Sequence, residues 1–199
     1  GLEKVKCGKI FFKQEEITGM SVKERCKRGI GYIPSDRYKR AILPGFSLKD
    51  NYLLGNQYKD SYARKGMLNQ EYIEKKTKEL MEKFDVRAVN GDQLIGALSG
   101  GNQQKLVLSR EVDKDPDLIL ACQPVRGLDI GAIKFIHNVL LELRNQGKAV
   151  LLISAELSDL FQLSDRIGVL YKGEMMSLQE TEKYTTESIS LLMAGKKGV

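Results

Sequence analysis

Short apolar runs alternate with amphipathic stretches along this chain. The runs Gly31–Pro34, Asp117–Cys122 and Ala149–Ser154 are almost wholly apolar over the length of a strand, which is typical of strands buried on both faces of a parallel sheet. The stretches Gln70–Phe84 and Gly131–Asn145 carry apolar residues at helical spacing, with polar residues between them. We therefore expect buried strands at the first set of positions and amphipathic helices at the second.

The ends of shorter elements are also marked in the sequence. Ser21 followed by Glu24 forms a capping box, which predicts a helix over 21–27 that ends at Gly29. The spacing of apolar residues predicts another helix beginning at Ser47. The remaining expected elements are a helix over 156–163, a hairpin of 166–171 and 174–178 around Lys172 and Gly173, and a final helix over 185–194.

The segment Ala97–Lys105, ALSGGNQQK, places two glycines where a loop becomes a helix. Backbone N–H groups, the Ser99 hydroxyl and the positive end of the helix converge there, and Gly100 and Gly101 let the backbone approach a ligand closely. This arrangement predicts an anion site. A Ser-Gly-Gly turn is common, however, so the prediction depends on the residues after it. Next come a helix with apolar residues at Leu106, Leu108 and Val112 that ends around 113–116, and the apolar strand 117–122.

The order of these motifs resembles that of the ATP-binding cassette (ABC) nucleotide-binding domain. LSGGNQQ, a helix, a buried strand, QPVRGLDIGA and a final SDRIGVLYKGE hairpin follow one another at family-like spacing over nearly the whole chain. The resemblance implies a P-loop NTPase-like α/β fold with a mainly parallel sheet flanked by helices. It also implies an α/β core formed by 1–46 and 115–199, and an α-helical subdomain, 47–114, that carries the signature loop, 98–103.

The phosphate-binding sequence GxxxxGK(S/T) does not occur in the 199 residues. In the ABC family that loop precedes a segment like GLEKVKCGKI, with which this sequence begins. The resemblance therefore implies that the N-terminal part of the cassette, with its phosphate loop, is absent from this chain. We expect the chain alone to be inactive as an ATPase, to bind Mg-ATP weakly or not at all, and to hold no cofactor.

Four family positions carry side chains that lack the usual chemistry. Ser35 stands where the Q-loop has Gln or Glu, and Ala155 stands where many members have the switch His. Cys122 and Gln123 replace the Asp that orients magnesium and the Glu that polarises water. A neutral thiol is a soft ligand, whereas Mg²⁺ requires hard oxygen ligands, and Gln cannot accept a proton. The resemblance thus implies a degenerate hydrolytic half-site, without catalytic residues or a metal site.

The signature loop, in contrast, is intact in the sequence, and in the family it faces a phosphate. By resemblance, Ser99, Gly100, Gly101 and Asn102 contact ATP that a partner cassette binds, and Asp129 of the RGLD sequence lies at the dimer interface. ATP and Mg²⁺ are then cofactors of the intact dimer. We hypothesise that this chain cannot hydrolyse its own ATP but completes the site of its partner.

The composition fits one ordinary globular domain, with 42% hydrophobic and 29% charged residues among 199. The longest apolar runs, near 118–122 and 149–153, are far shorter than a membrane span, and we expect no signal peptide. Three widely spaced cysteines without a CxxC pair favour reduced thiols in the cytosol.

The net charge is +6, from 32 basic and 26 acidic residues. The basic residues are dispersed in short runs such as 38–40 and 75–78 with acidic residues close by, so we interpret them as solvated surface and expect no nucleic-acid partner. A modest basic bias also suits a protein that works against a membrane surface or an acidic partner. His137, the only histidine, lies beside the apolar stripe of its helix, and we expect it to be structural.

The asymmetry between a degenerate half-site and an intact signature loop resembles the second, C-terminal cassette of the tandem ATPases of bacterial sugar and nucleoside importers. The resemblance implies a peripheral protein at the cytoplasmic face of the membrane. Its partners would be another cassette and permease subunits, contacted by about 35–51. Two alternatives are a structural dimerisation module with an idle signature loop and a non-transport ABC ATPase acting on nucleic acid. Undiminished ATPase in signature-loop variants would favour the first, and salt-dependent nucleic-acid affinity the second.

Overall fold

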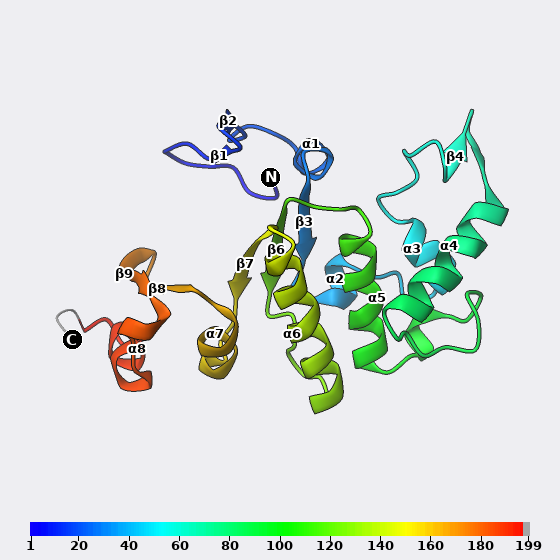
Figure 1. Ribbon diagram of the computed structural model, residues 1–199. Helices are drawn as coiled ribbons and strands as arrows, with labels where there is room; N and C mark the ends of the chain where they lie inside the picture. The colour runs from blue at the N-terminus through cyan, green and yellow to red at the C-terminus, as the bar shows by residue number, and fades with distance from the viewer. Residues whose placement is uncertain (197–199) are drawn as a thin grey trace. The chain divides into compact units, whose positions relative to one another are not determined.

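Strands β3 (Ile30–Ile33) and β6 (Leu118–Cys122) pair in parallel in the computed structural model of the chain (Figure 1). In their register Ile33 lies opposite Ala121, so both strands end at the same edge of the sheet. Strand β7 (Ala149–Ile153) is the third strand, in the order β3-β6-β7. The three apolar runs thus form one sheet, and the predicted parallel pairing is confirmed for β3 and β6.

Burial along this sheet is less complete than the apolar runs predict. In β6, Ile119 and Ala121 are fully buried, whereas the alternate positions are only half-buried. In β7, Leu151 and Ile153 are 54% and 52% exposed, so the expectation of a strand buried on both faces is wrong there. Successive side chains of a strand point to opposite faces of the sheet, and Val150 and Leu152 are half-buried while the alternate positions are exposed, so only one face of β7 is covered.

Helices α3 (Leu48–Leu53), α4 (Gln70–Lys83) and α5 (Gly100–Val112) pack against one another, and α5 also contacts β3 and α6 (Ile130–Asn145) (Figure 1). The predicted helices over 70–84 and 131–145 are confirmed to within one residue. Each large apolar side chain buried here contributes roughly 1.5–3 kcal/mol to the free energy of unfolding. The most deeply buried include Leu48, Tyr52, Leu80, Leu106 and Ile136.

The segment 41–51, part of the range expected to contact permease subunits, is fixed to α5 by a buried arginine. Arg110 is 6% exposed, and it donates from Nη1 to the Asn51 carbonyl and from Nη2 to the Ala41 carbonyl, at 2.9 Å each. A backbone bond of 3.1 Å from Ile95 to the Phe46 carbonyl adds a second attachment just before α5. These bonds hold the segment in a fixed position relative to α5.

The predicted capping box is confirmed at α1 (Val22–Lys27). Ser21 Oγ accepts a hydrogen bond from the Glu24 backbone N–H at 3.3 Å, and the Glu24 carboxylate accepts one from the Ser21 N–H at 2.8 Å. A short helix, α2 (Arg37–Arg40), was not predicted and begins at its cap, Asp36. The other short elements of this region are β1 (Phe11–Phe12), β2 (Glu15–Glu16), β4 (Ala63–Arg64), β5 (Met67–Leu68) and a 3₁₀ turn, η1 (Ile95–Ala97).

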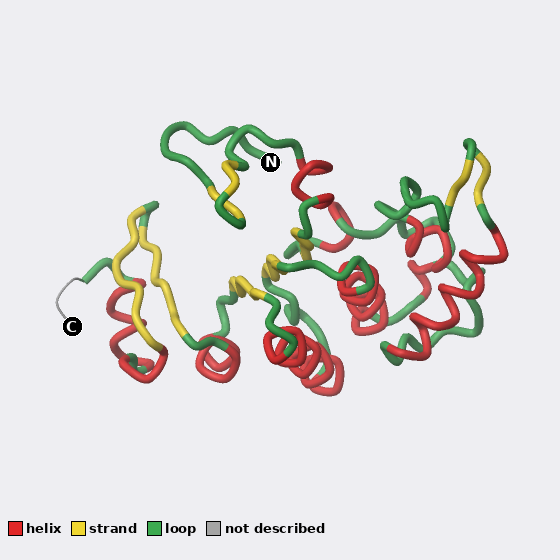
Figure 2. The backbone as a smooth tube through the Cα atoms, turned by 45° about the horizontal axis from the view of Figure 1, so that its top comes forward, coloured by secondary structure: helices red, strands yellow, loops and turns green. Residues whose placement is uncertain are grey.

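The structure describes residues 1–196, which divide into two compact units, and the second unit begins at Leu152. Its centre is the predicted hairpin of β8 (Arg166–Tyr171) and β9 (Glu174–Glu180), which is confirmed (Figure 2). The two residues between the strands, Lys172 and Gly173, have φ angles of 46° and 86°, as the tight turns of hairpins require. The unit also contains α7 (Leu157–Leu163), η2 (Thr181–Lys183) and α8 (Thr186–Met193), whose Ile189 and Leu192 pack on Ile167 and Val169 of β8.

Candidate functional site

Ser99 caps the N-terminus of α5 and is exposed to solvent. Its hydroxyl accepts hydrogen bonds from the Asn102 backbone N–H at 3.4 Å and from Asn102 Nδ2 at 3.1 Å. Among the described residues, the N–H groups of Gly100 and Gly101 have no acceptor, because the first N–H groups of a helix point beyond its end. Together with the positive end of the helix dipole, these donors give the predicted anion site its chemistry.

Both glycines lie where an added Cβ atom would meet a close neighbour. A Cβ atom on Gly101 would lie 3.0 Å from Ala132 Cβ and 3.1 Å from Asp129 Oδ2. A Cβ atom on Gly100 would lie 2.7 Å from Arg37 Nη2, the mobile end of a long side chain. The tighter restriction is at Gly101, where the start of α6 would have to shift.

Asp129 is placed beside the signature loop by its role as the cap of α6. Its Oδ1 accepts a hydrogen bond of 2.9 Å from the Ala132 N–H, and its other carboxylate oxygen lies against Gly101. The side chain is exposed. The structure thus brings together all five residues that the sequence singled out, namely Ser99, Gly100, Gly101, Asn102 and Asp129, at the neighbouring N-termini of α5 and α6.

The linker 85–92 is attached to α5 next to the signature loop. Asn102 Oδ1 accepts a hydrogen bond of 2.9 Å from the Arg87 N–H. Lys105 Nζ donates to the Asp85 carboxylate at 2.6 Å and to the Asp85 carbonyl at 3.0 Å. The bond from Lys105 holds the pKa of Asp85 below its usual value, and Arg87 lowers the same pKa further. The Asn102 amide is therefore engaged within the chain, which the loop sequence did not predict.

Gln103 is fully buried, so the expectation that the whole loop 98–103 faces a phosphate is wrong at its last position. Its Nε2 donates to the carbonyls of Ile95 at 3.2 Å and Leu98 at 3.1 Å, and its Oε1 accepts from Arg37 Nε at 3.1 Å. Packing turns this side chain inward because three polar partners lie there. Sequence reasoning missed Arg37 because its partner is 66 residues away and no motif joins them.

Three of the four family positions that lack the usual side chains lie at or just after the ends of paired strands. Ser35 comes after β3, Cys122 ends β6 and Gln123 follows it, so the parallel register brings them to one edge of the sheet. Burial raises the pKa of the half-buried Cys122 thiol, which keeps it protonated at neutral pH. The fourth, Ala155, is exposed in the second unit. None of these side chains offers the carboxylate oxygens that Mg²⁺ prefers or a group with a base's pKa.

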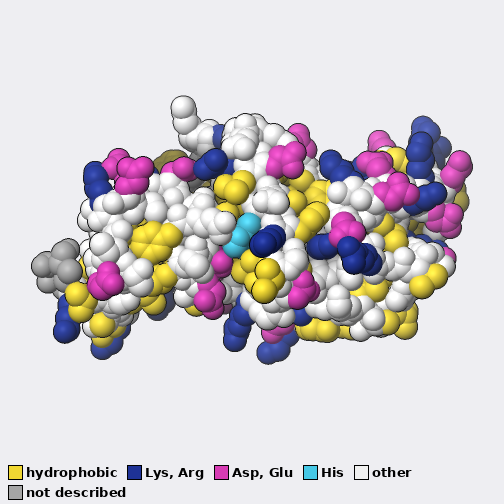
Figure 3. All heavy atoms as spheres, turned by 60° about the horizontal axis from the view of Figure 1, so that its bottom comes forward, with side chains coloured by type: hydrophobic (Ala, Val, Ile, Leu, Met, Phe, Trp, Pro, Cys, Tyr) yellow, Lys and Arg dark blue, Asp and Glu magenta, His cyan; other side chains and the backbone are white. Residues whose placement is uncertain are grey.

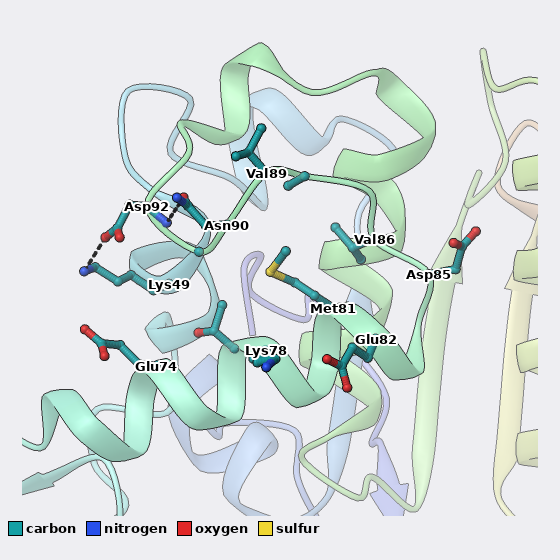
Figure 4. A pocket seen from close by; sticks show the side chains of 13 residues that line it. Lys49, Glu74, Lys78, Met81, Glu82, Asp85, Val86, Val89, Asn90 and Asp92 are labelled. Atoms are coloured by element: carbon teal, nitrogen blue, oxygen red, sulfur yellow. Dashed lines mark hydrogen bonds and ion pairs between the residues drawn. The ribbon is translucent and has the colours of Figure 1, made fainter.

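A hollow of about 600 Å³ opens between α4 and the linker 85–92 (Figure 4). Lys49 and Asp92 form an ion pair of 2.5 Å on one side of it, and Met81 contributes apolar surface. The Thr77 hydroxyl, on a residue 2% exposed, has no hydrogen-bond partner among the described residues. No residue of the signature loop lines the hollow, so it is separate from the anion site.

Positive and negative side chains are intermixed on the face shown in Figure 3. In the basic run 75–78, wherever it lies relative to that view, Lys76 pairs with both Glu79 and Asp113 at 2.8 Å. This mixture agrees with the interpretation of the short basic runs as solvated surface.

Within residues 1–196, no helix is long and apolar enough to cross a bilayer, and no group of three or more His, Cys, Asp or Glu side chains is placed to hold a metal ion. His137 is buried in α6, at 7% exposure.

Known proteins resemble this chain both in sequence and in fold. The family model described as ABC transporter matches residues 1–126. The guanosine import ATP-binding protein NupO of Bacillus subtilis (strain 168) is 42% identical over 195 residues, which are 98% of this chain and 38% of NupO. The nucleoside import ATP-binding protein NupA of Lactococcus lactis subsp. cremoris (strain MG1363) is 38% identical over 195 residues, with the same two coverages of 98% and 38%. The chain thus spans about two fifths of the length of these curated relatives.

One solved structure with this fold is the dimeric ATP-binding cassette MJ0796 in a post-hydrolysis state, bound to ADP and Pi. The TM-score is 0.74 at 22% sequence identity, over 92% of this chain and 77% of that one. At this identity the likeness establishes the fold, which is an α/β cassette with a parallel sheet and flanking helices.

Proposed function

Because this chain belongs to the ABC transporter family and has the fold of an ATP-binding cassette, we propose that it serves in the ATP-binding subunit of an importer. Its task there is to supply the signature loop to ATP that a partner cassette binds. The observation that carries this proposal is the N-terminus of α5, where the Ser99 hydroxyl is exposed. The N–H groups of Gly100 and Gly101 beside it have no acceptor among the described residues.

A triphosphate fits the chemistry of these donors. Phosphate oxygens accept hydrogen bonds strongly, and N–H groups at the positive end of a helix are ready donors to them. Gly100 and Gly101 carry no side chain that would shield their N–H groups, so a phosphate could approach the backbone itself. Asp129 fixes the start of α6 against this surface and so supports its position. ATP and Mg²⁺ are proposed as ligands of the assembled dimer, where ATP supplies the phosphates that these donors hold.

We further propose that the hydrolytic half-site of this chain is degenerate. None of Ser35, Cys122 and Gln123 carries a carboxylate at its family position, and Ala155 offers no imidazole. A general base needs a group that can take up a proton, and Mg²⁺ needs oxygen ligands. In this proposal the chain takes part in hydrolysis only at the site of its partner, and by itself it is inactive.

The cargo proposed for the complete transporter is a nucleoside or a simple sugar. The names of NupO and NupA support nucleosides, and the motif resemblance extends to the sugar branch. In this proposal the chain is the second, C-terminal cassette of a tandem ATPase, and its partner is the other cassette. The subunit then works as a peripheral protein at the cytoplasmic face of the membrane.

The division of labour along the chain is also a proposal. Residues 1–46 and 115–199 would form the α/β core and 47–114 the helical subdomain. Residues 35–51 would contact the permease subunits. The attachment of 41–51 to α5 through Arg110 supports this assignment, because it joins the contacting segment to the helix that begins at Ser99.

The test is the ATPase activity of the assembled two-cassette protein carrying single substitutions. We expect Ser99→Arg to lower turnover by about a hundredfold or more, since a bulky cation displaces the donors from the phosphate. Gln123→Ala should leave turnover within about twofold, because a degenerate half-site has little to lose. Ser21→Arg is the matched control, since Ser21 is also an exposed helix cap but lies away from the signature loop.

Other outcomes would favour the alternatives. Equal losses in Ser99→Arg and Gln123→Ala would contradict the asymmetry. Unchanged turnover in Ser99→Arg would point to a structural dimerisation module. A salt-dependent affinity for nucleic acid, measured on the assembled protein, would point to a non-transport ATPase.

A further inference from the structure

We propose that Arg37 is a positioning residue for the signature loop. It acts through Gln103, which fixes the turn from which Ser99 emerges. The inference rests on the proposed function only for its effect on ATP turnover, because the positioning itself is a property of this chain alone. Arg37 comes from α2, next to Ser35 and outside the signature motif, and it belongs to none of the sequence motifs that carry the family resemblance.

Gln103 holds the turn before Ser99 through its side-chain amide. Both amide hydrogens of Nε2 are donated to carbonyls of this turn, Ile95 at 3.2 Å and Leu98 at 3.1 Å. Leu98 directly precedes Ser99, so the bond to its carbonyl sets the direction in which the chain enters α5. Gln103 is 0% exposed, and no water can replace these bonds without opening the core.

Arg37 in turn holds Gln103. The remaining polar atom of the amide, Oε1, accepts a hydrogen bond of 3.1 Å from Arg37 Nε. A buried acceptor without a donor costs about 1–3 kcal/mol, so removing Arg37 leaves the amide under a penalty. Rotating the amide would not remove this penalty. It would turn Oε1 toward the Leu98 carbonyl, where two acceptors would face each other.

The same guanidinium also lies close to the loop. Arg37 Nη2 lies 2.7 Å from the position that a Cβ atom on Gly100 would occupy. The lack of a side chain at Gly100 leaves space for the guanidinium here. The group that binds Gln103 therefore lies beside Gly100, the first residue of α5.

A matched control lies two residues away on the same helix. Lys39 carries the same charge, its side chain is 83% exposed, and its nearest acid, Asp36, is 4.0 Å distant. Lys39→Ala removes one positive charge from α2 without touching Gln103. Any effect that arises from net charge alone should therefore appear equally in Lys39→Ala and Arg37→Ala.

The direct test is amide hydrogen exchange measured on the whole protein. The Leu98 N–H donates to the Ile95 carbonyl and the Gln103 N–H to the Ser99 carbonyl, so both amides report on the turn. We expect exchange at these amides to be about tenfold faster in Arg37→Ala and unchanged in Lys39→Ala, while amides of α4 keep their rates. Unchanged exchange at Leu98 and Gln103 in Arg37→Ala would overturn the inference.

The second test is a double-mutant cycle on ATP turnover of the assembled protein. Arg37→Ala should lower kcat by about tenfold with little change in KM, since a displaced loop is felt chiefly when it meets the phosphate. Arg37→Ala combined with Gln103→Ala should be no worse than Gln103→Ala alone, because Arg37 acts through Gln103. Losses that multiply would show that Arg37 acts independently of Gln103, and would overturn the proposed positioning through Gln103.

The outcomes separate this inference from the proposed function. If Ser99→Arg abolishes turnover while Arg37→Ala keeps both its turnover and its exchange rates, the inference fails alone. If Ser99→Arg leaves turnover unchanged while Arg37→Ala accelerates exchange, the proposed function fails and the positioning stands. Should Gln103→Ala not fold, the exchange rates of Arg37→Ala decide the matter.

Discussion

Asp129 and Gly101 lie in contact at the point where α5 and α6 begin. Asp129 Oδ2 is 3.1 Å from the position of a Cβ atom on Gly101, while Asp129 Oδ1 holds the Ala132 N–H at 2.9 Å. The Asp129 carboxylate therefore caps α6 and also limits the size of the residue at position 101, in the first turn of α5. The distance between the two helix N-termini is set by the lack of a side chain at Gly101.

This contact predicts the effect of Gly101→Ala. A helical Gly→Ala change gains about 1 kcal/mol in propensity, but overpacking a fixed neighbour costs about 1–3 kcal/mol. Ala132 Cβ, at 3.0 Å, cannot move without shifting α6, so we expect a net loss of about 1 kcal/mol in the free energy of unfolding, together with lower ATP turnover. Urea unfolding measures the first. Gly45→Ala is the control, since nothing lies within 4 Å of its Cβ position, and an equal loss there would refute the packing argument.

Two buried tyrosines give a prediction about stability and pH. Tyr62 is 2% exposed and its hydroxyl has no partner among the described residues, so burial raises its pKa to about 12. Tyr62→Phe should be neutral or slightly stabilising, whereas Tyr52→Phe should cost about 1 kcal/mol, because it breaks a 3.1 Å bond with Ser109. Urea unfolding of the two variants compares them, and equal losses would contradict the assignment.

The loss of stability at alkaline pH gives a second prediction about Tyr62. A raised pKa in the folded state means that the Tyr62 contribution is fully present below its ordinary pKa of 10.0 and is lost as the pH rises toward about 12. Tyr62→Phe should therefore move alkaline unfolding to higher pH. Absorbance of tyrosinate follows the titration, and an unshifted midpoint would show that Tyr62 ionises freely in the native state.

The ion pair between Lys105 and Asp85 predicts a response in acid. Hydrogen bonding to Lys105 lowers the pKa of Asp85, so this contribution to stability is present above the ordinary value of 3.8 and is lost as the pH falls through the lower native value. Lys105→Met should raise the Asp85 pKa toward 3.8, and Arg87→Met should raise it less, because Arg87 is the weaker cause. Carboxyl NMR titration measures both, and the reverse order would contradict the geometry.

Much of the fold can be predicted from the sequence because its signals are local. Helices α4 and α6 carry amphipathic patterns over three or more turns, and the capping box at Ser21 lies within four residues. The turn at Lys172 and Gly173 is similarly self-contained. The placement of residues 99–102 at a helix N-terminus can be predicted as well, since the motif itself builds that N-terminus.

The remainder depends on contacts between distant parts of the chain. Arg37 meets Gln103 across 66 residues, and Lys105 meets Asp85 across 20, with no sequence pattern to indicate either pair. The inward turn of Gln103 results from which carbonyls lie behind it, a property of the packed structure. The exposure of Leu151 likewise depends on what covers its strand, which an apolar run does not encode.

Helix α5 has attachments near both of its ends. It begins beside Ser99, and on its last turn Arg110 binds the Ala41 and Asn51 carbonyls. Thirteen residues of α-helix form a stiff rod of about 20 Å. Under the proposed function, a movement of 41–51 caused by the permease would displace the whole of α5 as a rigid body. The displacement would change the position of Ser99 relative to the nucleotide without any rearrangement of the sheet.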